Sequence, residues 1–170
     1  MKEYPNRKVN RLKNYNYSQD GAYFITICVK EKHEILGEIV VGDAALGVPS
    51  VHLTETGEMV KQHIEQINNV HEYVRLDKYI IMPNHIHLIV SITNETQHTT
   101  SGTPRAASPT KAVIPKIVNA LKSLTSKNFG GSIWQRSYHD HIIRNEAEYQ
   151  KIWEYIDTNP IRWETDEYHI

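Results

Sequence analysis

Residues 75–92 read RLDKYIIMPNHIHLIVSI, and this stretch decides the fold. Its two halves, 75–82 and 85–92, are rich in β-branched and aromatic residues and predict two strands. Pro83 and Asn84 separate them, and these two residue types favour a break between regular elements. A connection this short joins antiparallel neighbours, because parallel strands need a long crossover. The stretch therefore predicts two antiparallel strands near the middle of the chain.

Further elements lie on both sides of this stretch. Thr54 precedes apolar residues at helical spacing and is typical of an N-cap. The helix after residue 113 is expected to end at two glycines. The expected segments are strands at 23–29 and 35–41 paired as a hairpin, a short strand at 51–53, a helix to residue 68, a helix from 113 to Gly130 and Gly131, an extended stretch at 132–144, and a helix at 146–159 that ends before Pro160.

The order of these elements predicts an α+β protein. It runs strands, helix, strands, helix, strand and helix, with short connections between strands. We expect a ferredoxin-like (RRM-like) sandwich with a central antiparallel sheet and packed helices. The 170 residues suit a single domain spanning 1–170. A basic N-terminal arm at 1–20 and a polar loop at 93–110, rich in Ser, Thr and Pro, would extend from it.

Composition excludes several classes of protein. One cysteine, Cys28, excludes an intramolecular disulfide framework and cysteine-rich zinc folds. The N-terminus has no apolar run typical of a secretory signal, and the sequence has no stretch of about 18 apolar residues that would predict a membrane span. We therefore expect a cytoplasmic protein with no membrane partner.

The net charge of −1 hides a strong pattern along the chain. Residues 1–13 hold five basic residues and one acidic residue, and residues 96–139 hold six basic residues with no Asp or Glu. The segments that follow each basic block are acidic. Such blocks indicate an anionic partner. A solvated helix face that happens to be basic explains them equally well.

The two histidines of the second strand are candidate metal ligands. His85 and His87 are two residues apart and share one strand face, while Ile86 and Leu88 point to the other face, toward the core. The pair can grip one metal ion from the sheet surface. With 10 histidines in the chain, the spacing alone is weak, and two surface or core-edge histidines remain the simpler interpretation. His139 and His141 have the same spacing.

The last predicted helix carries a second candidate pair. Its apolar stripe consists of Tyr149, Ile152, Trp153 and Ile156. Tyr155 and Asn159 lie outside this stripe, four residues apart, so one helix face presents a phenol and a carboxamide together. Two structural interpretations stay open: Tyr155 packs at the edge of the stripe, and Asn159 caps the helix before Pro160.

Four runs of the sequence resemble one known family. The run 79–90, which contains Met-Pro-Asn-His-Ile-His, resembles the HUH motif of single-tyrosine HUH transposases. The runs 134–144 and 155–160 resemble the C-terminal signature of the branch called REP-associated tyrosine transposases, and 7–26 resembles the N-terminal segment of that branch. The resemblance covers nearly the whole chain in order.

This resemblance implies metal-dependent cleavage and rejoining of single-stranded DNA at hairpins or palindromic repeats through a 5′-phosphotyrosine. Carried over residue by residue, it makes Tyr155 the nucleophile and His85, His87 and Asn159 the ligands of Mg²⁺ or Mn²⁺. It leaves open a homodimer, since some relatives exchange helices. The DNA-binding residues would come from the basic blocks: Arg7, Lys8, Arg11, Lys13, Lys122, Lys127, Arg136 and, near the last helix, Arg144. The alternative is a domesticated, catalytically silent nucleic-acid-binding module on the same fold.

Overall fold

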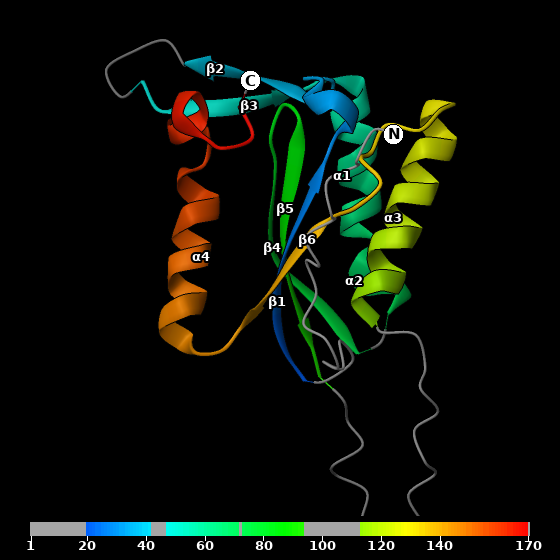
Figure 1. The fold of residues 1–170 in the computed structure, drawn as a ribbon, viewed down its shortest axis with the longest axis vertical. Coiled ribbons are helices and arrows are strands. Elements are labelled where there is room, and N and C mark those ends of the chain that lie inside the picture. The colour runs from blue at the N-terminus through cyan, green and yellow to red at the C-terminus, as the bar shows by residue number, and fades with distance from the viewer. Residues whose placement is uncertain (1–19, 42–46, 72, 94–112, 170) are drawn as a thin grey trace, which may run out of the picture.

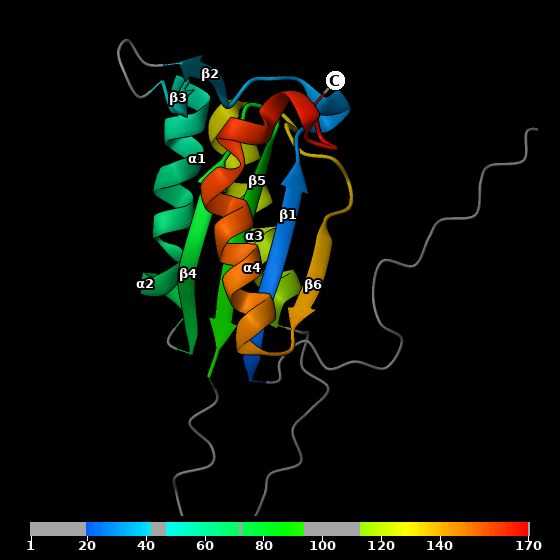
Figure 2. The same cartoon turned by 90° about the vertical axis from the view of Figure 1, so that its left-hand side faces the viewer.

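The computed structural model describes residues 20–41, 47–71, 73–93 and 113–169. Its centre is a four-stranded antiparallel sheet in the order β4-β5-β1-β6 (Figure 2). The strands are β1 (Gly21–Cys28), β4 (Val74–Ile81), β5 (His85–Ile92) and β6 (His139–Ile143). With one helical unit after β1 and another after β5, this is the ferredoxin-like order, and the predicted α+β fold is confirmed.

Helices cover both faces of this sheet (Figure 1). The elements are α1 (Glu55–Glu65), α2 (Ile67–Val70) and α3 (Val113–Phe129) on one side, and α4 (Glu146–Thr158) on the other. The larger core lies on the α1 and α3 side and takes Ile86 and Leu88 of β5. The smaller core lies under α4 and joins Ile89 and Ile156. The alternation of β5 between two cores is the period of two expected for a strand.

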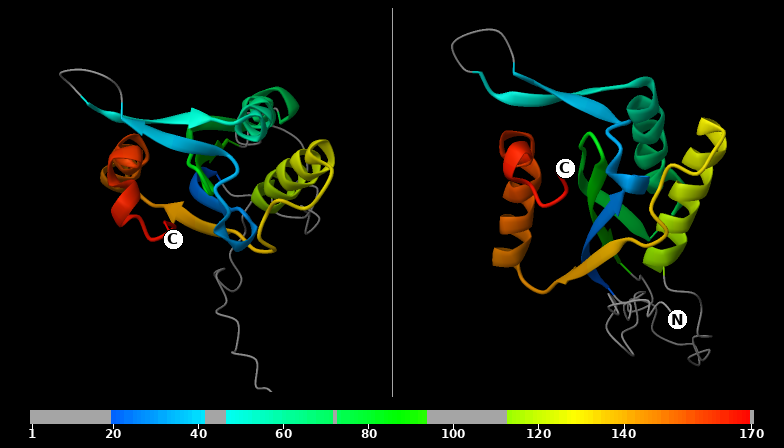
Figure 3. Two further views of the ribbon diagram at one scale, coloured as in Figure 1. Left: turned by 90° about the horizontal axis from the view of Figure 1, so that it is seen from above. Right: turned by 45° about the horizontal axis from the view of Figure 1, so that its top comes forward.

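The predicted hairpin between the first two strands is wrong. β2 (Gly37–Val41) pairs with β3 (Pro49–Leu53) in a separate two-stranded sheet. The reason is that β1 already pairs with β5 on one edge and β6 on the other, so β1 has no free edge. The β2–β3 hairpin instead lies across one end of the molecule and contacts the segment after α4 (Figure 3).

The helix ends agree with the sequence in part. The Thr54 hydroxyl accepts a hydrogen bond from the Gly57 N–H at 3.1 Å, so the predicted N-cap is confirmed. The first helix breaks at Gln66 into α1 and the short α2 instead of continuing unbroken to residue 68. The last helix ends before Pro160 as predicted, since α4 stops at Thr158 with Asn159 as its C-cap. Pro160 then begins a separate 3₁₀ helix, η3 (Pro160–Thr165), because proline is tolerated in a first turn.

Most of the N-terminal arm at 1–20 and of the polar loop at 93–110 lies outside the described residues, and so do the predictions made for these segments. None of the helices in the described ranges is long and apolar enough to cross a membrane.

The contact between α1 and the chain before β2 allows a direct test. A Cβ at Gly57 would lie 1.9 Å from the backbone oxygen of Leu36, whereas one at Gly131 would meet no atom within 4 Å. Gly57→Ala should lower the free energy of unfolding by at least about 2 kcal/mol, because the buried backbone must shift. Gly131→Ala should change it by no more than about 0.5 kcal/mol. Urea denaturation followed by circular dichroism measures both, and equal midpoints would contradict this packing.

Candidate functional site

The two histidines of β5 face α4 and are buried. His85 is 0% and His87 1% exposed, and their Nε2 atoms are 3.1 Å apart. Their rings meet edge to face at a centroid distance of 4.6 Å. The predicted shared face is therefore confirmed. The pair does not lie on an open sheet surface, however, because α4 and the C-terminal segment cover it.

Each histidine is oriented through its other ring nitrogen. His85 Nδ1 donates to Asn84 Oδ1 at 2.9 Å, since the Asn84 amide nitrogen already donates to the backbone oxygens of Lys32 and Tyr168. His87 Nδ1 lies 2.8 Å from Thr26 Oγ1. The Thr26 hydroxyl can donate or accept, so it permits either tautomer of His87. Both Nε2 lone pairs can thus turn toward one cation.

Burial keeps both imidazoles neutral. It lowers the pKa of His85 to about 4, although Asp166 and Asn159 act in the opposite direction. It also lowers the pKa of His87 well below the usual value for histidine, and the neighbouring His85 adds to this effect. A neutral imidazole is the form that binds a metal ion.

Helix α4 brings the predicted tyrosine and asparagine to the histidines. Its stripe packs through Ile156, which is 1% exposed, against Ile89 and Ile143 of the sheet. The Tyr155 hydroxyl lies 3.4 Å from His87 Nε2, at the long end of hydrogen bonding. Asn159 is the C-cap of α4 and is also buried against the site, so the capping and ligand interpretations are compatible.

Asp166 is a site residue that the sequence did not reveal. Its Oδ2 accepts hydrogen bonds from Asn159 Nδ2 at 2.9 Å and from the Tyr155 hydroxyl at 3.3 Å. Because a carboxylate only accepts, it fixes the Asn159 nitrogen toward itself and leaves Asn159 Oδ1 buried without a hydrogen-bond partner among the described residues. No spacing rule points to Asp166, since it follows a 3₁₀ turn and not a helix or strand.

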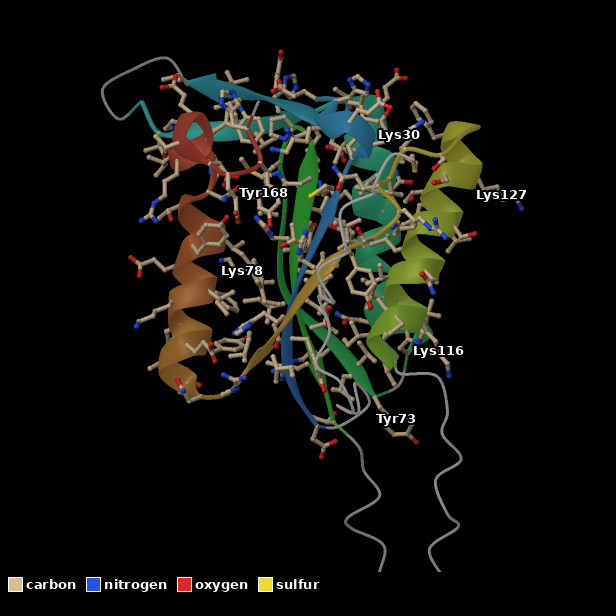
Figure 4. The ribbon with its side chains drawn as sticks, viewed as in Figure 1. Lys30, Tyr73, Lys78, Lys116, Lys127 and Tyr168 are labelled. Carbon is tan, nitrogen blue, oxygen red and sulfur yellow. The ribbon has the colours of Figure 1, made fainter. Side chains whose placement is uncertain are left out.

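The surroundings of Tyr155 disfavour its phenolate. Burial, together with the negative charges of Asp166 and Glu167, raises the pKa of Tyr155 to about 12. The ring of Tyr168 also packs against both imidazoles, at centroid distances of 4.6 and 5.7 Å, and lies between α4 and the sheet (Figure 4). The site is therefore closed by apolar and aromatic surface in this structure.

The donor set of this site fits a divalent cation. Adjacent ligands of an octahedral ion at about 2.1 Å lie roughly 3 Å apart, and the two Nε2 atoms are 3.1 Å apart. The buried oxygen of Asn159 supplies a third, oxygen donor. Among the described residues no three His, Cys, Asp or Glu side chains form a metal-binding group, so a metal site here would need that amide oxygen.

The predicted DNA-binding residues do not share one environment in the structure. Arg7, Lys8, Arg11 and Lys13 lie outside the described residues. Lys122 is half-buried, and its ammonium donates to the backbone oxygens of Gln135 and Arg136, so part of its role is structural. Lys127 and Arg136 are exposed near one end of α3, whereas Arg144 lies at the opposite end of β6.

Of the second histidine pair, His141 lies away from the first pair, whereas His139 has as its strand partner Thr26, which is also the strand partner of His87. His141 Nε2 lies 2.7 Å from Glu148 Oε1, and Glu148 also accepts from the Arg144 backbone N–H. His141 thus ties β6 to the first turn of α4. Its strand partner is Phe24, whereas those of His85 and His87 on β1 are Cys28 and Thr26.

Asp166 should be tested against its acidic neighbour. Asp166→Ala removes the acceptor of the buried Asn159 amide and of the Tyr168 backbone N–H. We expect a loss of about 1–3 kcal/mol in the free energy of unfolding. Glu167→Ala removes an exposed carboxylate and should cost no more than about 0.5 kcal/mol. Equal effects in urea denaturation would show that Asp166 does not organise the site.

Comparison with known proteins supports the fold. No family model matches the chain. An uncharacterized protein of Haemophilus influenzae (strain ATCC 51907 / DSM 11121 / KW20 / Rd) is 37% identical over 175 residues, which cover 96% of this chain and 93% of that protein. The solved structure of the REP-associated tyrosine transposase bound to a REP hairpin is similar over 95% of this chain and 74% of that chain, with a TM-score of 0.59 and 17% identity. The chain therefore belongs to one family with the H. influenzae protein and has the fold of the REP-associated tyrosine transposase.

Proposed function

We propose that the protein is a metal-dependent enzyme that cleaves and rejoins single-stranded DNA through Tyr155. One observation carries the proposal: a tyrosine hydroxyl lies 3.4 Å from the nearer of two paired histidine nitrogens, with an unpartnered amide oxygen buried beside them. A nucleophile beside a metal-binding set is an arrangement that supports phosphoryl transfer. The hairpin bound by the transposase of the same fold makes a hairpin-bearing single strand the substrate to test.

His85, His87 and Asn159 would hold Mg²⁺ or Mn²⁺. A bound divalent cation would supply a Lewis acid for one oxygen of the scissile phosphate. Two neutral imidazoles and an amide would leave the positive charge of such an ion uncompensated by its ligands, and the nearby negative charge would be that of Asp166. Asn84 and Thr26 keep the imidazoles oriented, which fixes the direction of both Nε2 lone pairs.

Tyr155 would attack the phosphorus atom with its phenolic oxygen. The new bond joins that oxygen to phosphorus, and the bond from phosphorus to the 3′ oxygen breaks, which leaves a 5′-phosphotyrosine. The departing 3′ oxygen takes a proton from solvent and becomes a free 3′-hydroxyl. The phenolic proton needs an acceptor, because the pKa of Tyr155 is raised to about 12. Asp166 Oδ2, at 3.3 Å from the hydroxyl, is in position to accept it. A free 3′-hydroxyl can reverse the step and rejoin strands.

A second candidate is a nucleic-acid-binding module that does not cleave. Two contacts at the site favour this second candidate. The Tyr155 hydroxyl donates a hydrogen bond to Asp166, and the ring of Tyr168 covers the imidazoles. DNA binding without any covalent product in the wild-type protein would support this candidate over the first.

The nucleophile is tested with two tyrosine variants from one helix. Wild-type protein with Mn²⁺ and a hairpin-bearing single strand should give a covalent protein–DNA adduct on a denaturing gel. Tyr155→Phe should give none, because it removes the attacking oxygen. Tyr149→Phe should still give the adduct, since Tyr149 packs in the core under α4 and not at the histidines. An adduct formed by Tyr155→Phe would refute the assignment.

The metal site is tested by binding alone. His85→Ala and His87→Ala should each weaken Mn²⁺ binding by at least about tenfold in calorimetric titration, because each removes one of three ligands. His52→Ala, an exposed histidine of β3, is the matched control and should bind like the wild type. Unchanged affinity in both site variants would remove the ion from the mechanism.

A further inference from the structure

One lysine of β4, Lys78, reaches across to α4. Its side chain is 18% exposed and lies between α4 and the sheet (Figure 4). The ammonium forms an ion pair with Asp157 and lies 4.2 Å from the centroid of the Trp153 ring. A cation over an indole ring is attracted by the negative face of that ring. Lys78 therefore holds α4 through two directional contacts at once.

The surface around Lys78 is open. A groove of about 500 Å³ lies along the outer edge of β4, and its wall on the α4 side consists of Trp153, Ile156 and Asp157. Of the ion pairs within the described ranges, only that of Lys78 joins α4 to β4. An open groove resists a small rotation of a helix less than close-packed side chains do. The orientation of α4 on this side therefore depends on Lys78.

The start of α4 is held separately. Glu148 Oε1 lies 2.7 Å from His141 Nε2 on β6. Glu148 precedes Tyr155 by seven residues, which is about two helical turns. Trp153 and Asp157, in contrast, are each two residues from Tyr155. The turn that carries Tyr155 is therefore held from β4 and not from β6.

The two α4 partners of Lys78 lie on the helix face opposite Tyr155. Trp153 and Asp157 are four residues apart and share one face. Tyr155 is two residues from each, which places it about 160° away around the helix axis at about 100° per residue. Ile156 packs on the sheet between these two directions. A rotation of the helix about this contact that breaks the ion pair therefore also moves the Tyr155 hydroxyl relative to the histidines.

A small rotation is enough to disturb the site. The Tyr155 hydroxyl is already 3.4 Å from His87 Nε2. Side-chain ends lie about 5–6 Å from a helix axis, so a rotation of about 20° moves them by about 2 Å. A displacement of about 1 Å at a reacting group can lower a rate by about 100-fold. The apolar contacts of the small core are not directional and oppose such a rotation less than a charge pair does.

We propose that Lys78 is a positioning residue for Tyr155. By holding Trp153 and Asp157 it fixes the rotation of α4, and so it fixes the distance from the phenolic oxygen to the two histidines. This inference rests on the proposed function and adds a residue that lies on the other side of α4 from Tyr155.

The position of Tyr155 is tested by NMR spectroscopy. Its ring signals, assigned by their loss in Tyr155→Phe, report the edge-to-face contacts with Phe24 and His87 at centroid distances of 6.1 and 5.3 Å. Lys78→Met removes the ammonium, keeps an apolar stem, and should shift these signals. Lys61→Met removes an ammonium that is paired with a carboxylate on α1, and this matched control should leave them unchanged. Lys78→Arg should restore the wild-type signals, because a guanidinium both pairs with a carboxylate and stacks on an indole.

The effect on the reaction separates positioning from binding. With Mn²⁺ and a saturating hairpin-bearing single strand, Lys78→Met should form the covalent adduct at least about tenfold more slowly than the wild type. Its hairpin affinity, measured by fluorescence anisotropy, should equal that of Lys61→Met, which loses the same charge. Asp157→Asn removes the ion pair from the α4 side, where the Asp157 side chain is 55% exposed and the fold tolerates the change. It should slow adduct formation in the same direction, and it carries the test alone where Lys78→Met fails to fold.

Two results would overturn the inference. One is that the Tyr155 ring signals in Lys78→Met are the same as in Lys61→Met. The other is that Lys78→Met forms the adduct at the wild-type rate once the DNA is saturating, which reports binding alone. Failure of the proposed function gives a different result. The wild-type protein then forms no adduct, while the Tyr155 signals still shift in Lys78→Met and return in Lys78→Arg.

Discussion

The candidate site depends on the packing of α4 against the sheet. Ile156 contacts Ile89 and Ile143 in a small core that is separate from the larger one under α1 and α3. Burial of such side chains contributes about 1.5–3 kcal/mol each to the free energy of unfolding. Here it also sets the position of α4 on the sheet. With the helix fixed at Ile156, its neighbour Tyr155 reaches His87, and Asn159 reaches the same site one turn later. A loss of this small core would separate Tyr155 and Asn159 from the two histidines even if the larger core stayed intact.

Local patterns in the sequence were sufficient to predict most of the fold. The alternation of β5 placed His85 and His87 on one face, and the four-residue spacing on α4 placed Tyr155 and Asn159 together on one helix face. Both predictions hold because they depend on the period of a single element. The β1–β2 hairpin failed because strand pairing depends on which edges remain free, and β6, more than 90 residues further along, occupies the edge that a hairpin would need.

The partners of the site residues were beyond the reach of local patterns. Asp166 meets Asn159 and Tyr155 through a 3₁₀ turn whose direction no periodicity specifies. Asn84 lies in the predicted turn. Its amide nitrogen donates to the backbone oxygens of Lys32 and Tyr168, which are far apart in sequence, and this leaves its side-chain oxygen to accept from His85. The burial of the site could not be predicted from the pattern of β5 either, because the ring that covers the imidazoles belongs to Tyr168 in the C-terminal segment.

The outer edge of β4 bears on how copies of this protein can associate. The Leu76 backbone N–H on that edge donates to the side chain of Asn68 at 2.6 Å, and the register shifts between Leu76 and Lys78. Lys78 forms an ion pair with Asp157 beside it. An occupied donor, an irregular register and charge all disfavour the addition of another strand. Two copies joined at this edge would have to break the hydrogen bond from Leu76 to Asn68, so a continuous eight-stranded sheet is an unfavourable route to a dimer.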